Sequence, residues 1–387
     1  MTQDTAKEPI NWTSLLTSLS PEQKSLLFGP REVYDAAYRK DKVIVISYDE
    51  VLKMANIMKG ADMTHLRLQD VFIVAKIMRR APPLQDKQLQ SCRMVLSRRF
   101  MLWAADAGYP EAQLFWSEEV MSQNNVPTGV RDKALKLLTN IGRQAVPRAE
   151  SVPLKSLRPT DTVFPVSARA NHLLGRYLWA AGDLTKTTTK RDECRDRAMQ
   201  HLERAGEEGH AEAYVYMGVF NRRAGKARMS KRAFEKAHAL GSALGTWLLA
   251  RATSDTKLRT SLLAEAVGLG SHHAAYDLGH MYRKQGQDAL AIEYYTMAAE
   301  ADVQPAQANL AELLVKQGEF DEAEKWFIRA SVVRAPDPKK ETRTGQDGDI
   351  SFHSQRRLEQ MRKTQVYNDY QRAKQKKLDE GGSCTIM

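Results

Sequence analysis

The residues with the most specific chemistry in this chain are the four at its end, Cys384-Thr385-Ile386-Met387. A cysteine followed by two middle residues and a final methionine forms a C-a-a-X signal, which directs a farnesyl group to the cysteine. Ile386 is the aliphatic residue that the signal prefers, whereas Thr385 is a less usual residue at the other middle position. The motif predicts that the last three residues are removed, that Cys384 carries a lipid, and that the chain is held at a membrane surface.

A basic segment just before this motif offers a second membrane signal. One short lipid alone binds a bilayer reversibly, so stable anchoring needs a further contribution. Cations near an anionic leaflet contribute on the order of 1 kcal/mol each. The segment contains four of them: Arg372, Lys374, Lys376 and Lys377. A run of charges by itself indicates a solvated helix, so the predicted contact with an anionic membrane depends on the C-a-a-X motif.

Other groups of residues that carry chemistry are missing from the sequence. His272, His273 and His280 are the clustered histidines, and the last two are seven positions apart, which is too far for metal binding without other ligands. The three cysteines are also far apart in the chain. Neither a nucleophile elbow, a P-loop nor a dinucleotide-binding glycine loop occurs. We therefore predict no catalytic residues, no cofactor, no metal and no enzymatic activity.

The composition predicts a folded chain without a membrane-spanning segment. Of the 387 residues, 42% are hydrophobic, so the chain can bury a large core. No apolar run approaches the roughly 20 residues that cross a bilayer. The N-terminus lacks the features of a secretory or mitochondrial targeting signal. We expect a cytoplasmic location, peripheral at a membrane through the lipid, with a mitochondrial location as the alternative.

The net charge of +11 indicates an acidic partner, which is a membrane, a protein or a nucleic acid. Basic residues are distributed along the whole chain, with the C-terminal segment as one denser stretch. No known nucleic-acid-binding module is present. Nucleic acid is therefore the least favoured of the three partners.

Small residues recur at a regular spacing in the C-terminal half of the chain. An alanine or glycine that follows a turn marks each copy, and successive markers are 32, 29 and 32 positions apart: Ala213, Gly245, Ala274 and Ala306. Ala170 and Ala112 mark earlier and less regular copies. A period near 30 residues with small residues at fixed positions is typical of stacked helix pairs.

A second column of residues supports this register. A large apolar residue stands three positions before the alanine that ends each second helix: Leu202, Phe234, Leu263, Tyr295 and Phe327. A short helix pair cannot bury its apolar face alone and has to stack on its neighbours. The small residues then mark the helix crossings, and the large residues fill the space between neighbouring units.

The best preserved copy resembles the Sel-like repeat family, an α/α-solenoid relative of the tetratricopeptide repeat. The matching residues are Ala275-Tyr276-Asp277-Leu278-Gly279, Met281-Tyr282, Gly286, Ala291, Tyr294-Tyr295 and Ala298-Ala299. The next copy, residues 306–330, is closer to the tetratricopeptide pattern. The resemblance covers residues 165–334, and more weakly 95–145. It implies an all-α, superhelical α/α solenoid that binds proteins without catalysis.

These patterns divide the chain into five segments. We expect a helical N-terminal region over 1–94 that caps the stack, degenerate repeat units over 95–145 and a linker over 146–164. The Sel-like or tetratricopeptide-like solenoid follows over 165–335, and a basic tail over 336–387. Within the tail, residues 351–378 are expected to form one charged helix that protrudes or docks only in part.

The first helix of each pair lines the inner groove in solenoids of this kind, and a protein partner is expected there. The candidate groove residues are the aromatic and basic side chains on or just after the predicted first helices: Tyr214, Tyr216, Arg222, Arg223, Tyr276, Tyr282, Arg283 and Lys284.

Three functions are consistent with this reading of the sequence. The first is a non-enzymatic scaffold or adaptor, prenylated and held at the cytosolic face of a membrane, that recruits or activates a partner there. In architecture such a protein is similar to the fungal activators of chitin synthase. The second is a soluble or mitochondrial assembly factor or chaperone of the tetratricopeptide-like type. The third is an RNA-binding helical repeat protein.

Overall fold

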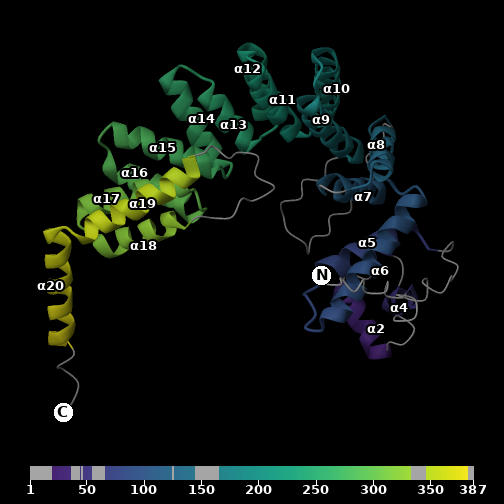
Figure 1. Ribbon diagram of the computed structural model, residues 1–387, viewed down its shortest axis with the longest axis horizontal. Coiled ribbons are helices and arrows are strands. Elements are labelled where there is room, and N and C mark those ends of the chain that lie inside the picture. The colour runs from purple at the N-terminus through teal and green to yellow at the C-terminus, as the bar shows by residue number, and fades with distance from the viewer. Residues whose placement is uncertain are drawn as a thin grey trace, which may run out of the picture. The chain divides into compact units, whose positions relative to one another are not determined.

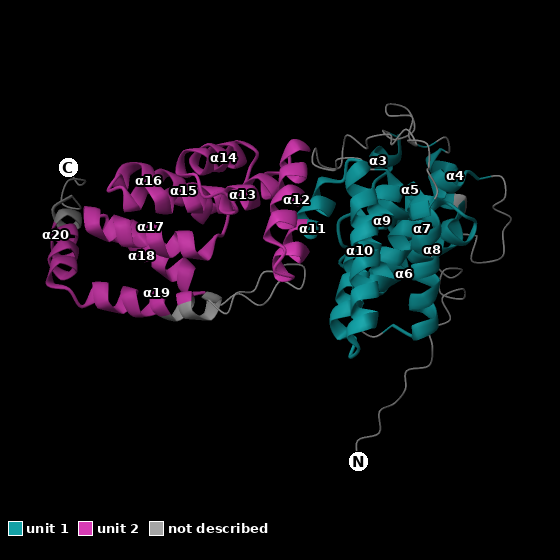
Figure 2. Cartoon of the chain, turned by 90° about the horizontal axis from the view of Figure 1, so that it is seen from above, with its two compact units in different colours: residues 1–217 teal, residues 218–387 magenta. Residues whose placement is uncertain are grey.

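The computed structural model of the chain describes residues 20–35, 44, 47–54, 66–123, 126–143, 165–332 and 346–381. Every regular element in these ranges is a helix, and consecutive helices pack against one another (Figure 1). The chain is therefore an all-α protein of the α/α-solenoid class, which confirms the predicted fold class. None of the described helices has both the length and the apolar character needed to cross a membrane. The chain divides into two compact units, residues 1–217 and 218–387 (Figure 2).

The first unit begins with a group of packed N-terminal helices. They are α2 (Pro21–Phe28), α3 (Arg31–Asp35), α4 (Tyr48–Lys53), α5 (Leu68–Arg80) and α6 (Lys87–Asp106). Arg93 of α6 is buried and donates hydrogen bonds of 2.6, 3.1 and 2.6 Å to the carbonyl oxygens of Leu26, Leu27 and Pro82. Burial lowers the pKa of Arg93, and the three carbonyls supply the acceptors that a buried guanidinium needs. Arg93 thereby ties α2 and the segment after α5 to α6.

The rest of the first unit continues as consecutive helices. They are α7 (Pro110–Ser122), α8 (Thr128–Arg143), α9 (Val166–Leu184), α10 (Thr188–Glu207) and α11 (Ala211–Arg223), whose last residues belong to the second unit. Leu114, Leu138 and Leu174 come from three of these helices and meet in one buried cluster. The linker 146–164 that precedes α9 lies outside the described residues.

The second unit stacks helix pairs and ends with two C-terminal helices. Its helices are α12 (Ala227–Ala239), α13 (Ala243–Arg251), α14 (Thr256–Gly268), α15 (His272–Lys284), α16 (Asp288–Glu300), α17 (Gln304–Gln317), α18 (Phe320–Ser331), α19 (Gln346–Arg362) and α20 (Gln365–Gly381). The first helices α13, α15 and α17 each pack on their own second helix and on the preceding one.

The large apolar column that recurs in the sequence forms the core of the stack. Its members are each at most 1% exposed: Leu202, Phe234, Leu263, Tyr295 and Phe327. Glycines on the first helices make room for two of the rings. A Cβ added to Gly218 would lie 2.2 Å from Phe234 Cε1, and one added to Gly279 would lie 2.7 Å from Tyr295 Cδ1. The small residues therefore do mark close helix crossings.

The turns between neighbouring repeats place one residue in the left-handed backbone region. Gly209, Gly241 and Gly270 occupy this position with φ of 91°, 73° and 91°. Asp302 occupies it in the next copy with φ of 66°, and it is the one residue other than glycine with a positive φ in the described ranges. Its carboxylate accepts a 2.7 Å hydrogen bond from Arg329. A contact with the neighbouring helix thus accompanies a backbone conformation that an L-residue rarely adopts.

The charged C-terminal segment differs from the expected single helix over 351–378. The chain forms two helices, because it turns after Arg362 and Thr364 caps α20 by accepting a 3.2 Å hydrogen bond from the amide of Tyr367. α19 packs on α17 and α18. Its Leu358 and Met361 are buried in one cluster with Ala311, Phe320, Ala323 and Phe327. These two apolar residues, three positions apart, anchor a helix whose other residues are mostly polar, and Arg357 and Arg362 of the same helix add ion pairs to Glu312 and Glu324.

Candidate protein-interaction surface

The first helices of the second unit present one side to solvent. On α15, the side with Ala274, Ala275, Leu278 and Gly279 is buried. The opposite side of α15 and the matching positions of its neighbours are exposed or half-buried. We call this surface the first-helix face, and its members are Trp247 and Arg251 of α13, His273, Tyr276, Asp277, His280 and Arg283 of α15, and Asn309 of α17.

Trp247 is the centre of the contact between α13 and α15 on this face. Its indole Nε1 donates a 2.7 Å hydrogen bond to Asp277 Oδ2. The His273 ring stacks on the indole with a centroid distance of 5.0 Å, and the Arg251 guanidinium lies 5.2 Å from the indole centroid. A half-buried tryptophan is therefore held in one orientation by three neighbours, each of which still has exposed surface.

The contact between α15 and α17 has similar components. Trp247 and Tyr276 both stand two positions after a repeat marker, and Asp277 and Asn309 both stand three positions after one. Arg283 Nη1 donates a 3.2 Å hydrogen bond to Asn309 Oδ1. Burial raises the pKa of Tyr276 above its ordinary value. The face is thus a row of aromatic rings and polar groups fixed by contacts between repeats.

α19 borders the C-terminal end of the first-helix face. A surface cavity of about 490 Å³ is lined by residues of α15, α17 and α19: Arg283, Asn309, Glu312, His353, Arg356, Arg357 and Gln360. Glu312 accepts hydrogen bonds of 2.5 and 2.6 Å from Arg357, and these bonds raise the pKa of Arg357. Three arginines against one glutamate give the cavity a positive charge, which suits a carboxylate or carbonyl oxygen of a bound chain.

Four of the predicted groove residues lie on α15. Tyr276 and Arg283 belong to the first-helix face. Tyr282 instead stacks on Tyr294 of the adjacent α16, with ring centroids 5.4 Å apart, so it is part of the contact within one helix pair. Lys284 is exposed at the end of α15.

The other four predicted groove residues lie on α11. Tyr214 is buried, and a Cβ added to Gly206 would lie 2.4 Å from its Cζ, so Tyr214 fills the contact between α10 and α11 and offers no binding surface. The Tyr216 ring is half-buried under the Arg176 guanidinium, 4.7 Å from its centroid. Arg222 and Arg223 are exposed at the end of α11.

A buried histidine pair lies in the first unit. The rings of His172 and His210 have centroids 4.3 Å apart, and their ligand atoms and those of Glu212 lie within 4.8 Å of one another. Burial lowers the pKa of His210 to about 4 and lowers that of His172 as well. Positive charge on Arg176 and Arg169 also lowers the pKa of His172, and the same charge opposes a metal ion. We therefore interpret the pair as an aromatic packing contact.

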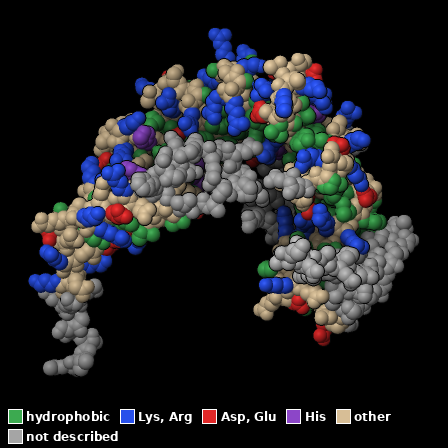
Figure 3. All heavy atoms as spheres, in the orientation of Figure 1, with side chains coloured by type: hydrophobic (Ala, Val, Ile, Leu, Met, Phe, Trp, Pro, Cys, Tyr) green, Lys and Arg blue, Asp and Glu red, His purple; other side chains and the backbone are tan. Residues whose placement is uncertain are grey.

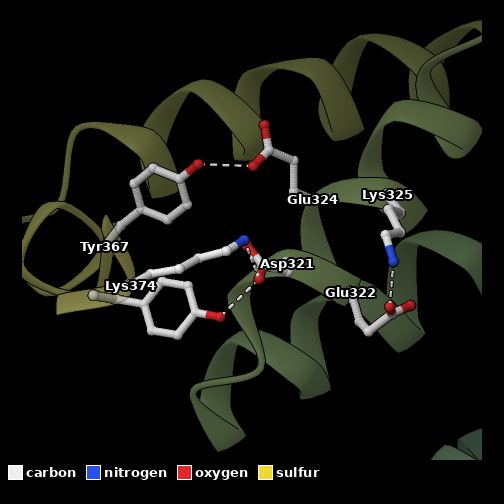
Figure 4. A network of polar contacts seen from close by, with 7 residues as sticks. Asp321, Glu322, Glu324, Lys325, Tyr367 and Lys374 are labelled. Carbon is white, nitrogen blue, oxygen red and sulfur yellow. Dashed lines mark hydrogen bonds and ion pairs between the residues drawn. The ribbon is translucent and has the colours of Figure 1, made fainter. Parts of the chain in front are cut away.

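The basic C-terminal helix α20 is docked on α18 through polar contacts (Figure 4). Asp321 accepts hydrogen bonds of 2.6 Å from Lys374 and 2.8 Å from Tyr370, and these bonds lower its pKa. Glu324 accepts a 2.7 Å hydrogen bond from Tyr367 and is also bonded to Arg362. Burial alone would raise the pKa of Glu324, but these two donors lower it.

The predicted polybasic residues are therefore only partly available. Lys374 is paired with Asp321, and Arg372 lies 3.5 Å from Asp369. Lys376 is exposed. The side chain of Lys377 and the lipidation residue Cys384 lie outside the described residues.

Several residues of the first-helix face were absent from the predicted groove list. Trp247, Asp277 and Asn309 are on it because neighbouring first helices meet there. The signal that would have found them is the register itself, since all three stand two or three positions after a marker. The arginines of α19 carried no such signal, because α19 lies outside the repeats.

The comparison with family models supports the repeat assignment for the C-terminal part of the chain. Residues 274–308 and 306–341 match the model of the tetratricopeptide repeat. These stretches cover most of α15 and all of α16 to α18, so this part of the chain consists of tetratricopeptide-like repeats, a class of helical repeat that commonly serves protein interaction. No curated protein matches the chain.

Solved structures of helical-repeat proteins are similar to the chain at low identity. A protective antigen of uropathogenic Escherichia coli with an SLR fold is 15% identical, with 89% of this chain and 71% of that chain covered and a TM-score of 0.48. A Sel1 repeat protein from Oxalobacter formigenes is 16% identical, with coverage of 68% and 82% and a TM-score of 0.34. MamA is 21% identical, with coverage of 38% and 93% and a TM-score of 0.29. Because these TM-scores are below 0.5, the likenesses do not establish the fold class, which follows from the packing of consecutive helices.

Proposed function

We propose that this chain is a non-catalytic scaffold that binds a partner protein on the first-helix face. The observation that supports this most directly is the half-buried Trp247, which Asp277, His273 and Arg251 hold in one orientation. Tryptophan, tyrosine and arginine are the residues that most often dominate binding energy at protein interfaces. Side chains already held in place lose little conformational entropy when a partner binds.

The chemistry of the face indicates what kind of segment it takes. Aromatic surface from Trp247 and Tyr276 offers an anchor for an apolar side chain. Arg283, with the arginines of the adjoining cavity, offers donors to carboxylates and backbone carbonyls of the same segment. A peptide segment with an apolar residue close to an acidic one matches both features.

Site-specific photo-crosslinking in the native cell tests this proposal. The crosslinking amino acid is placed at His273 or His280 of the face and, as matched controls, at exposed Lys257 and Glu293 of second helices. We expect both face positions to yield the same partner adduct and the controls to yield none. Equal adducts from the two sets of positions would contradict the proposal.

A substitution at the centre of the face makes the same test quantitative. Trp247→Ala should weaken binding of the identified partner by roughly 30-fold or more, the usual loss for a central aromatic residue. The melting temperature of the variant reports whether the helix pair remains folded. If the folded variant binds the partner with unchanged affinity, Trp247 is not part of the binding surface.

We also propose that a farnesyl group on Cys384 tethers this scaffold to a membrane. The support is the C-a-a-X motif, which acts only where Met387 is the natural last residue. Intact-mass measurement of the protein from its native source tests this directly. A chain that ends at a prenylated Cys384 is the expected result, and an unmodified chain that continues through Met387 contradicts it.

A further inference from the structure

Six cations gather where α11 ends and α12 begins, all within the second unit. We call this group the α12 basic edge, and its members are Arg222, Arg223, Lys226, Arg228, Lys231 and Arg232. All six side chains are exposed, and none has an ion pair or hydrogen bond with another residue in the described part of the chain. Figure 3 shows blue Lys and Arg side chains at the top of the view, where Figure 1 labels α12.

This charge is a property of one repeat. Between positions 222 and 236 the one acidic residue is Glu235. The second helix α16 contains no lysine or arginine, and α18 has three acidic residues against Lys325 and Arg329. Stacking of the repeats therefore does not require the α12 basic edge.

Arg222 and Arg223 lie in the last turn of α11, where the helix dipole favours cations, but the other four cations of the edge are unfavourable for α12. α12 has no acidic residue in its first turn, and its N-cap residue Lys226 makes no side-chain cap. Cations near a helix N-terminus are repelled by the helix dipole. Arg228 stands three positions before Lys231 and four before Arg232, and like charges at these spacings repel one another. Helix stability therefore does not account for the four cations at the start of α12, and their arrangement points to a bound anion.

We propose that the α12 basic edge binds anionic lipid headgroups at a membrane surface. The edge consists of two exposed helix ends and the turn at Gly225, and such an exposed turn suits a flat anionic surface better than a peptide, which needs a groove. Met229 lies in the middle of the cations and is 51% exposed, as in interfacial segments where an apolar side chain enters among the headgroups. The edge has no aromatic residue on which the bases of a single-stranded nucleic acid would stack.

The contrast with α20 strengthens this assignment. Lys374 and Arg372 of α20 have acidic partners within the chain, at 2.6 and 3.5 Å. The α12 basic edge has none among the described residues, so its charge is available to phosphate oxygens. This lipid contact depends neither on a modified Cys384 nor on the partner at the first-helix face, and its failure would leave both of those proposals standing.

Vesicle sedimentation with the full, unlipidated chain tests the proposal. The probes are vesicles of phosphatidylcholine alone and vesicles that also contain phosphatidylserine. The chain should sediment with the second kind only, and less so as salt is raised. Sedimentation with neither kind, or equally with both, would overturn the proposal.

Two double charge reversals locate the contact. Arg228→Glu with Arg232→Glu changes the edge, and Arg372→Glu with Lys376→Glu makes the same change in net charge on α20. We expect the first variant to lose binding to phosphatidylserine vesicles by at least about tenfold and the second to retain most of it. Glutamate near the start of α12 favours the helix dipole, so the first variant should remain folded, as its melting temperature reports.

The same variants separate lipid from other anions. Equal losses in both variants would indicate a response to net charge alone and would contradict a lipid site at α12. Single-stranded RNA at matched phosphate concentration is the competing probe. If RNA binds through the α12 basic edge and anionic vesicles do not, the ligand of the edge is a nucleic acid and the lipid proposal is wrong.

Discussion

The ring of Tyr295 lies against the backbone of Gly279, so close that a Cβ on the glycine would be 2.7 Å from Tyr295 Cδ1. Gly218 of α11 and Phe234 of α12 stand in the same relationship two helix pairs earlier in the chain, where the corresponding distance is 2.2 Å. The first helix of each of these pairs therefore approaches the ring of its second helix closely because it has no side chain at the crossing. This contact is repeated along the stack and provides the most direct test of the register.

Gly279→Val should destabilise the chain by about 1–3 kcal/mol, because the added atoms overlap a ring that is fully buried. The measurement is thermal or urea unfolding followed by circular dichroism. Gly268→Ala is the matched control, since nothing lies within 4 Å of a Cβ at this helical glycine. That control should be neutral or slightly stabilising, and equal melting of the two variants would show that the crossing is wrongly placed.

Asp302→Ala should lower stability by about 1–2 kcal/mol. Alanine retains the unfavourable left-handed φ of 66°, and it also loses the 2.7 Å contact with Arg329. Asp302→Gly separates these two effects, because it relieves the backbone but loses the same contact. We expect the glycine variant to be clearly more stable than the alanine variant in urea unfolding. Identical curves for the two would show that the backbone conformation at this turn costs nothing.

Acid should destabilise the first unit through its buried histidines. The folded pKa of His210 is lowered to about 4 by burial, while the unfolded value is near 6.5. The unfolded state thus binds more protons below pH 6.5, and stability falls as the pH is lowered from about 6.5 towards 4. His210 alone contributes on the order of 2–3 kcal/mol to this loss, and His172, whose pKa is also lowered, adds to it.

Melting temperature as a function of pH checks this dependence. His210→Asn removes one titrating group and should flatten the curve between pH 6.5 and 4. His272→Asn is the control, because His272 is exposed on α15. An acid dependence that His210→Asn leaves unchanged would assign the effect to other groups.

Leu358→Ala should loosen the two C-terminal helices. Leu358 is buried against α17 and α18, and removing a buried leucine side chain costs about 2–5 kcal/mol. Limited trypsin digestion should then cut within α19 and α20 well before the repeats are cut. Val366→Ala is the control, since Val366 is 66% exposed. Equal protection of the two variants would mean that the polar contacts of Asp321 and Glu324 suffice to hold these helices.

The repeats were predictable from sequence because a stacked helix pair imposes a local pattern. Ala274 and Gly279 stand five positions apart on one helix, and each copy repeats this spacing of small residues. The groove residues were less predictable. Tyr214 and Tyr216 are two positions apart, yet the first is buried in a helix contact and the second lies under Arg176. A small rotation of a helix about its axis decides which of two such side chains is buried and which is exposed, and the sequence of the helix alone does not predict that rotation.

The sequence by itself determined that this protein is a stack of helix pairs, since burial of the column from Leu202 to Phe327 follows from spacing alone. Only the tertiary structure decided that Trp247 meets Asp277, that α19 docks through Leu358, and that Lys374 is tied to Asp321. Those pairs are 30 or more positions apart or join segments outside the repeats. Their contacts depend on how whole helices are oriented against one another, which is a balance of many small packing energies and not a property of any short stretch of chain.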